Sequence, residues 1–303
     1  MEDERGRAAS PVSRPAARPR HVGVSTVVLL APACVLFALF VIYPIVASVR
    51  LSLYDWNGVG EMTFVGLANY RELATDPVFR TALGNNLRWL GCYLVAPIVG
   101  LALALLLHRA AFGMGAVRSL FFMPFVVSQV VVGLVFGWFF NTRFGLFNAL
   151  LQSVGIGPVA PFDSEVWSLY PMIVAGLWPQ IAYCMILYLT GRTSVAQDSI
   201  DAARVDGAHR WSLVRYVIVP QLRPVHFIVA MVCAVAALRS FDYVMIMTLG
   251  GPHDSSTVLA YYMYEQTFVA TRYGYGAAVA VVLLALMSAI IVALLWRMFR
   301  HER

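Results

Sequence analysis

The chain has no lysine, since all 22 of its basic residues are arginine. A Walker A loop needs a lysine to reach the β- and γ-phosphates of a nucleotide, so the chain cannot itself be a P-loop ATPase. Covalent catalysis through a lysine Schiff base is excluded for the same reason.

Charge is scarce as well. Only 13% of the 303 residues are charged, and 60% are hydrophobic. Soluble domains carry about 25% charged and about 45–50% apolar residues, so this composition excludes a soluble globular enzyme, and its apolar content excludes a disordered chain. The cysteines form no CxxC pair and lie in apolar runs, which predicts neither a metal site nor disulfides. They are Cys34, Cys92, Cys184 and Cys233. The composition indicates a membrane protein with several spans.

Six apolar stretches are long enough to cross a bilayer. None shows the alternation of a barrel strand, so we predict an all-α membrane protein with six transmembrane helices. The first apolar run is too long for a cleaved signal peptide and predicts an uncleaved anchor. The expected spans are Val24–Ala47, Asn85–Leu107, Val117–Phe140, Val166–Thr190, Pro224–Met247 and Ala277–Trp296.

The arginines are concentrated in alternate connecting segments, which predicts that both termini are cytoplasmic. The basic charge then reflects topology, and no nucleic-acid partner is expected. We expect a disordered, arginine-rich cytoplasmic tail over residues 1–22 and a first transmembrane helix over 23–48. An outer loop over 49–84 and a core of five spans over 85–299 follow.

The cytoplasmic loop over residues 191–223 is long and strongly patterned. Ser194 followed by Gln197 has the form of a capping box, which predicts a helix running to about Val205. Gly207 stands where a helix end favours a left-handed residue. A second helix is expected from there until Pro220, which cannot continue the hydrogen-bond ladder.

Two interpretations of this loop stay open on physical grounds. The small residues Ala202 and Ala203 would let another protein approach the first helix closely. Alternatively, both helices lie in the membrane interface.

The loop resembles the EAA loop of ABC importer permeases. The family pattern has Glu-Ala-Ala, a glycine four residues later and a distal Ile-x-Leu-Pro. Here Asp201 replaces the glutamate, Val217 the isoleucine and Val219 the leucine, all conservatively. Asp206 and Trp211 also match the version found in sugar importers. The matching residues are Asp201, Ala202, Ala203, Gly207, Val217, Ile218, Val219 and Pro220.

Further segments resemble carbohydrate importer permeases of the maltose type, in the same order along residues 25 to 296. They are Tyr43-Pro44, Asp55-Trp56, Phe64-Val65-Gly66-Leu67, Asn69-Tyr70, Phe144-Gly145-Leu146 with Asn148, Arg239-Ser240-Phe241-Asp242, and Gly250-Gly251-Pro252 with Thr257.

The resemblance implies a type I ABC importer permease fold that forms half of a translocation pathway in the bacterial inner membrane. It implies a second permease chain, two ATPase subunits, an extracytoplasmic solute-binding protein, a sugar substrate and surrounding lipid. ATP and Mg²⁺ would be bound by the ATPase, with no cofactor and no catalytic residue on this chain. The alternative is a permease for a non-sugar solute such as glycerol phosphate or a polyamine.

Transporter solute sites lie near the membrane midplane, where spans three and four carry polar and aromatic side chains. These candidate solute-pathway residues are Ser128, Gln129, Trp178, Gln180 and Tyr183. Trp178 could stack on a sugar ring, and the glutamines could bond its hydroxyls. The polar groups could instead satisfy one another between packed helices. Pro179 is expected to bend span four.

Arg239 and Asp242 are charges predicted well inside a span, where charge is costly and indicates function. Three residues apart, they would share one helix face and could pair. We expect an intramembrane pair with a structural or gating role, and direct solute contact is the alternative.

Other membrane classes fit less well. The six spans show no internal repeat of the kind common in secondary transporters. The histidines form no HExxH motif of a membrane metalloenzyme, and neither later outer loop has the short apolar segment of a channel filter.

Overall fold

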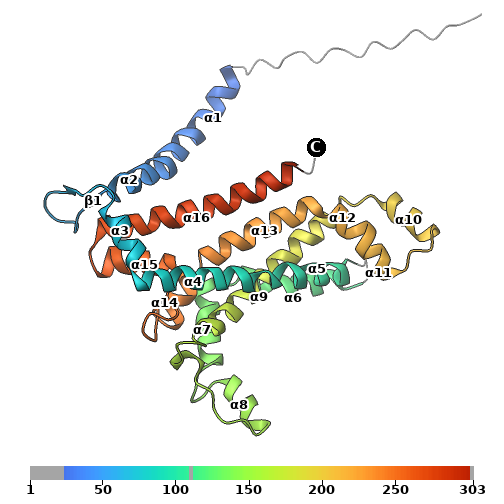
Figure 1. Cartoon of the computed structure of the whole chain (residues 1–303). Helices are drawn as coiled ribbons and strands as arrows, with labels where there is room; N and C mark the ends of the chain where they lie inside the picture. Colours follow the sequence, from blue (N-terminus) through green and yellow to red (C-terminus); the bar gives the residue numbers. More distant parts are fainter. Residues whose placement is uncertain (1–23, 109–111, 301–303) are drawn as a thin grey trace, which may run out of the picture. The chain divides into compact units, whose positions relative to one another are not determined.

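The computed structural model describes residues 24–108 and 112–300 (Figure 1). The tail expected over residues 1–22 lies outside them. The chain divides into two units, residues 1–47 and 48–303, and each is described by itself.

The first unit is helical over its described length. Helix α1 (Val24–Phe37) passes through a π-helical turn, η1 (Ala38–Ile42), into α2 (Tyr43–Leu51), which enters the second unit at Ser48. The stretch Val28–Leu51 is long and apolar enough to cross a membrane.

The second unit opens with a small two-stranded ribbon, the one departure from an all-helical architecture among the described residues. Strand β1 (Tyr54–Asp55) pairs antiparallel with β2 (Thr63–Phe64), with Tyr54 opposite Phe64. Helix α3 (Ala68–Thr75) follows. Asn69 on α3 donates to the carbonyl oxygens of Ser52 and Tyr54 at 2.9 and 3.0 Å, which fixes the ribbon to this helix.

Five helices in the described residues can cross a membrane, or six when one bent pair counts as a single span. Besides the N-terminal helix, they comprise α4 (Pro77–Tyr93) with α5 (Val95–Leu107), the bent pair α6 (Met114–Val126) and α7 (Gln129–Phe139), α9 (Leu169–Arg192), α13 (Arg223–Leu238) with α14 (Phe241–Met247), and α16 (Tyr273–Arg300). The helical class is confirmed, and the orientation of the termini stays a prediction.

The connecting segments lie on two sides of the spans. Helices α10 (Gln197–Val205) and α11 (Arg210–Leu213) lie beyond the ends of α5 and α13, and α3 and α15 (Leu259–Tyr264) lie at the opposite end (Figure 1). We call the side of the 193–222 loop the near side and the opposite side the far side. Counting α6–α7 as one span places the 140–168 segment, with α8 (Leu146–Ser153) and the turn η2 (Pro161–Asp163), on the far side.

The second span begins at Pro77, eight residues before the expected start at Asn85, so the loop expected over 49–84 is largely helical. Asp76 caps this helix, because its carboxylate accepts from the backbone N–H of Val78 at 2.8 Å. Two buried asparagines join this helix to the far-side segment before α15. The side-chain oxygen of Asn86 accepts from Leu259 N at 2.9 Å, and Asn85 donates to the Thr257 carbonyl at 2.8 Å. The polar side chains at the expected start of the span thus have hydrogen-bond partners inside the fold.

The third span is not the straight helix that the sequence predicts. Its halves meet at 91°, because Val127 and Ser128 adopt extended backbone conformations between them. Pro124 lies one turn earlier, but nothing in the sequence specified a right angle.

Close contact between α5 and α9 depends on Gly100. A Cβ atom there would lie 2.6 Å from Cys184 Cβ and 2.9 Å from the backbone nitrogen of Met185. We therefore expect Gly100→Leu to force the helices apart and to abolish the monodisperse peak of the purified protein in detergent. Gly91→Leu is the matched control, since a Cβ at Gly91 meets nothing within 4 Å. Equal behaviour of the two variants would contradict this packing.

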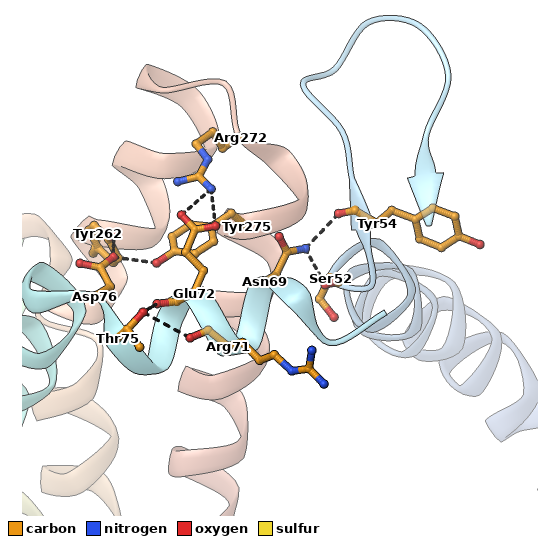
Figure 2. A network of polar contacts seen from close by, with 10 residues as sticks. All are labelled: Ser52, Tyr54, Asn69, Arg71, Glu72, Thr75, Asp76, Tyr262, Arg272 and Tyr275. Atoms are coloured by element: carbon orange, nitrogen blue, oxygen red, sulfur yellow. Dashed lines mark hydrogen bonds and ion pairs between the residues drawn. The ribbon is translucent and has the colours of Figure 1, made fainter. Parts of the chain in front are cut away.

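A polar network joins α3 and α4 to α15 and α16 on the far side (Figure 2). Asp76 accepts hydrogen bonds from the hydroxyls of Tyr262 and Tyr275, the latter at 2.6 Å. Arg272 donates to both carboxylate oxygens of Glu72, at 2.7 and 2.8 Å, and its guanidinium lies 4.3 Å from the Tyr275 ring centre. Segments about 190 residues apart in the sequence are thereby joined.

Candidate functional site

A cavity of about 410 Å³ lies between the spans and carries most of the expected solute-pathway residues. Gln129 at the start of α7 and Gln180 and Tyr183 on α9 line it together. Phe125 stacks on Tyr183 with ring centres 4.5 Å apart and planes within 7°. The lining thus combines amide groups with an aromatic pair, a mixture suited to a ligand that is both polar and flat-faced.

A smaller cavity of about 60 Å³ adjoins the first and shares Phe125, Gln129 and Gln180 with it. Tyr93, Tyr243 and Ser240 add hydroxyls to its wall. Gly176 allows this arrangement. A Cβ atom at this position would clash with the Tyr93 hydroxyl and would lie 3.0 Å from Cζ3 of Trp89. These tyrosines were missed by sequence reasoning, since their aromatic rings made them indistinguishable from core residues.

Trp178 does not join this cavity. It lines a separate apolar cavity of about 360 Å³ with Leu120 and Ile181, and its ring packs against Phe136. Trp178 and Gln180 are two residues apart on a continuous helix, so they point about 200° apart. Ser128 lies at the break between α6 and α7, is exposed, and does not line either cavity that contains Gln129.

Arg239 and Asp242 both line the larger cavity. The chain is not one helix between them, because α13 ends at Leu238 and α14 begins at Phe241. No ion pair joins the two side chains within the part of the chain that the structure describes. Their pairing stays a prediction, and in this conformation each presents its charge to the cavity.

The near-side loop forms a helix, a glycine turn and a second helical segment. Gly207 has φ +83°, and the backbone N–H of Ala208 donates to the Ala203 carbonyl at 2.9 Å while that of Gly207 donates to Arg204 at 3.0 Å. These two bonds make a Schellman motif, as the glycine predicted. Asp201 accepts from Arg204 at 3.0 Å and from Gln197 at 3.1 Å, which stiffens α10.

Two local predictions for this loop were wrong. The residue before α10 is Ala196, with no side-chain cap, so Ser194 and Gln197 form no capping box; the Ser194 hydroxyl bonds the Gly191 carbonyl instead. Pro220 does not end the second helix. A π-helical turn, η3 (Val214–Ile218), leads into α12 (Val219–Gln221), and its wider spacing accommodates a proline ring that would clash in an α-helix.

The loop exposes large apolar side chains next to its glycine turn. Val205 is 88% exposed and Trp211 77% exposed, and Asp201, Ala202, Asp206 and Pro220 are exposed as well. Ile200 on α10 and Ile218 on η3 are buried and hold the loop against the span ends. A fixed loop with an uncovered apolar tip has the form of a docking surface.

Residues 96–301 match the family described as binding-protein-dependent transport system inner membrane component. The chain belongs to this family. It is thus an ABC importer permease subunit of the inner membrane, a transport component and not an enzyme.

Similar proteins cover nearly the whole permease. A probable ABC transporter permease of Pyrococcus horikoshii is 33% identical over 91% of this chain and 96% of its own. The alpha-glucoside transport system permease AglF of Rhizobium meliloti is 32% identical over 87% and 79%. The sulfoquinovosyl glycerol transport system permease SmoG of Agrobacterium fabrum is 30% identical over 91% and 90%.

The fold of the permease also resembles a solved structure. A chain of a bacterial ABC transporter that imports the acidic polysaccharide alginate superposes with a TM-score of 0.80 at 20% identity, covering 91% of the permease and 95% of that chain. This likeness supports the type I permease fold and no finer conclusion about the solute.

Proposed function

We propose that the permease forms half of the pathway of a sugar importer and binds its solute in the 410 Å³ cavity. The observation that carries this proposal is the cavity wall, where Gln129, Gln180, Arg239 and Asp242 surround the Phe125–Tyr183 stack. Amide, guanidinium and carboxylate groups can bond the hydroxyls of a sugar while aromatic faces cover its C–H surfaces. Relatives named for sugar transport favour the same solute class.

We further propose that the near-side loop docks into a separate ATPase subunit. The exposed Val205 and Trp211 beside the rigid glycine turn support this role. The alternative is that both helices of the loop lie in the membrane interface. The absence of lysine excludes a P-loop on this chain and favours ATP binding by a partner. A second permease chain and an extracytoplasmic binding protein would complete the importer, and a non-sugar solute such as glycerol phosphate or a polyamine stays the alternative.

The assembly is tested by purifying the tagged permease from its host in mild detergent. We expect a second permease chain and an ATPase subunit to accompany it. Purification of the chain alone would overturn the heteromeric proposal.

The cavity is tested by transport. Reconstituted with its partners, the importer carrying Gln180→Leu is expected to take up solute about three- to tenfold more slowly, because each lost neutral hydrogen bond contributes about 0.5–1.5 kcal/mol. Leucine is similar in size, so the buried site should still fold. Trp178→Leu is the matched control on the same helix and should keep normal uptake, since Trp178 lines another cavity. The reverse pattern would place the solute elsewhere.

A further inference from the structure

Helix α8 in the far-side 140–168 segment exposes an apolar ridge that the proposed function does not use. Leu146 and Leu150 on α8 and Val154, the residue directly after its end, recur at four-residue intervals and are 57%, 55% and 70% exposed. Residues at this spacing lie above one another on a helix surface. The ridge is therefore a continuous strip of uncovered apolar surface.

The ridge belongs to an ordered segment. Asn148 is buried on the inward face of α8. Its amide nitrogen donates to the Val159 carbonyl at 2.8 Å, and its side-chain oxygen accepts from Val159 N at 2.8 Å. Asn141 accepts from the backbone of Arg143 at 2.9 Å at the start of the same segment. These bonds fix which face of α8 points outward.

The other exposed residues of α8 are small or polar, namely Ala149, Gln152 and Ser153. Gln152 lies about 200° around the helix from Leu150. Residues 144–162 contain no charged residue and no histidine. The ridge thus offers neither a charge nor a side-chain hydrogen-bonding group to orient a protein partner.

The apolar surface of α8 continues onto the far end of a span. Phe147 on α8 lines an apolar cavity of about 250 Å³ together with Tyr170, Pro171 and Val174 from the first turns of α9. Trp167 and Tyr170 are exposed beside it, and Trp138 is exposed at the end of α7. Exposed tryptophan and tyrosine at span ends mark the boundary between hydrocarbon and headgroups.

We infer that α8 is an interfacial helix whose ridge of Leu146, Leu150 and Val154 is inserted into lipid on the far side of the membrane. A short amphipathic helix held at a span end can bury its apolar face at the headgroup–acyl boundary while its polar face stays in water. This site requires only that the neighbouring spans cross the bilayer. It does not depend on the solute or on ATPase docking.

Nitroxide labels test the inference in the assembled transporter. The four native cysteines are replaced by alanine, and Leu150→Cys and the matched Gln152→Cys are labelled separately and reconstituted into vesicles of phosphatidylethanolamine and phosphatidylglycerol. Power saturation then compares collision with membrane-soluble O₂ and a water-soluble nickel chelate. We expect label 150 to collide severalfold more with O₂ than with the chelate, and label 152 to show the opposite.

Two results would overturn it. Equal chelate access at both positions would place the ridge in water, and shielding of label 150 from both reagents would mean that protein covers it. Val154→Cys supplies a second ridge position should Leu150→Cys assemble poorly, and ATP-driven uptake by the labelled transporter separates a failed assembly from a failed inference.

Discussion

Gly207→Val is expected to release the ATPase from the purified transporter, with at least about tenfold less ATPase recovered. An L-residue in the left-handed conformation costs about 1–2 kcal/mol, and a β-branched one costs more. A change of about 1.4 kcal/mol alters an equilibrium tenfold. Relaxing the strain would turn α10 relative to α11 and misplace Val205 and Trp211. The measurement is the ratio of ATPase to permease after affinity purification.

Gly60→Val is the control for this experiment. Gly60 has φ +80°, close to the +83° of Gly207, and a Cβ atom at either position meets nothing within 4 Å. The two substitutions therefore impose the same backbone strain in equally open surroundings, one on the near-side loop and one in the β1–β2 connection. Retention of the ATPase by both variants would show that it docks elsewhere.

Asp76→Ala is expected to lower the free energy of unfolding by about 3 kcal/mol. It removes a helix cap, worth about 0.5–2 kcal/mol, and two hydrogen bonds to a charged group, worth about 1.5–3 kcal/mol each before solvent exposure reduces them. Because these bonds join α4 to α15 and α16, the loss should appear as a lower thermal midpoint of the detergent-purified permease.

Two variants separate the contributions at Asp76. The double change Tyr262→Phe and Tyr275→Phe keeps the cap and should cause most of the loss. Asp55→Ala changes an exposed aspartate on β1 and should shift stability by no more than about 0.5 kcal/mol. An Asp76→Ala midpoint equal to that of Asp55→Ala would contradict the network's role in stability.

Acid should reproduce this loss. Burial raises the pKa of Asp76, but hydrogen bonds from Tyr262, Tyr275 and the backbone of Val78 and Phe79 outweigh it and hold the pKa below its ordinary value of 3.8. A depressed carboxyl pKa contributes stability that is fully present above the unfolded-state pKa and lost as pH falls through the folded-state value. The difference in midpoint between wild type and Asp76→Ala should thus be constant at neutral pH and shrink below about pH 4.

The sequence predicted the features that depend on composition and local chemistry. The spans were evident because helices facing lipid are apolar all round, and Gly207 ended its helix as expected. The first turns of the second span were missed because Arg80 and Thr81 interrupt the apolar pattern ahead of Asn85. Trp178 and Gln180 point to opposite sides of α9 because they are two residues apart on one helix, and this could have been predicted from the sequence. The bend at Val127–Ser128 and the π turn before Pro220 had no local signature.

That bend has a consequence for how the chain enters the membrane. With 13 and 11 residues, α6 and α7 are about 20 and 17 Å long, and neither alone crosses a hydrocarbon core of about 30 Å. A segment of half the membrane thickness is not expected to leave the translocon and enter the lipid stably by itself. We expect the bent arrangement of α6 and α7 to be retained only after α9, which packs against both, has been synthesised. Insertion of this region is thus a cooperative step that extends from Met114 to the end of α9, and faults in α9 should appear as wrong topology upstream of it.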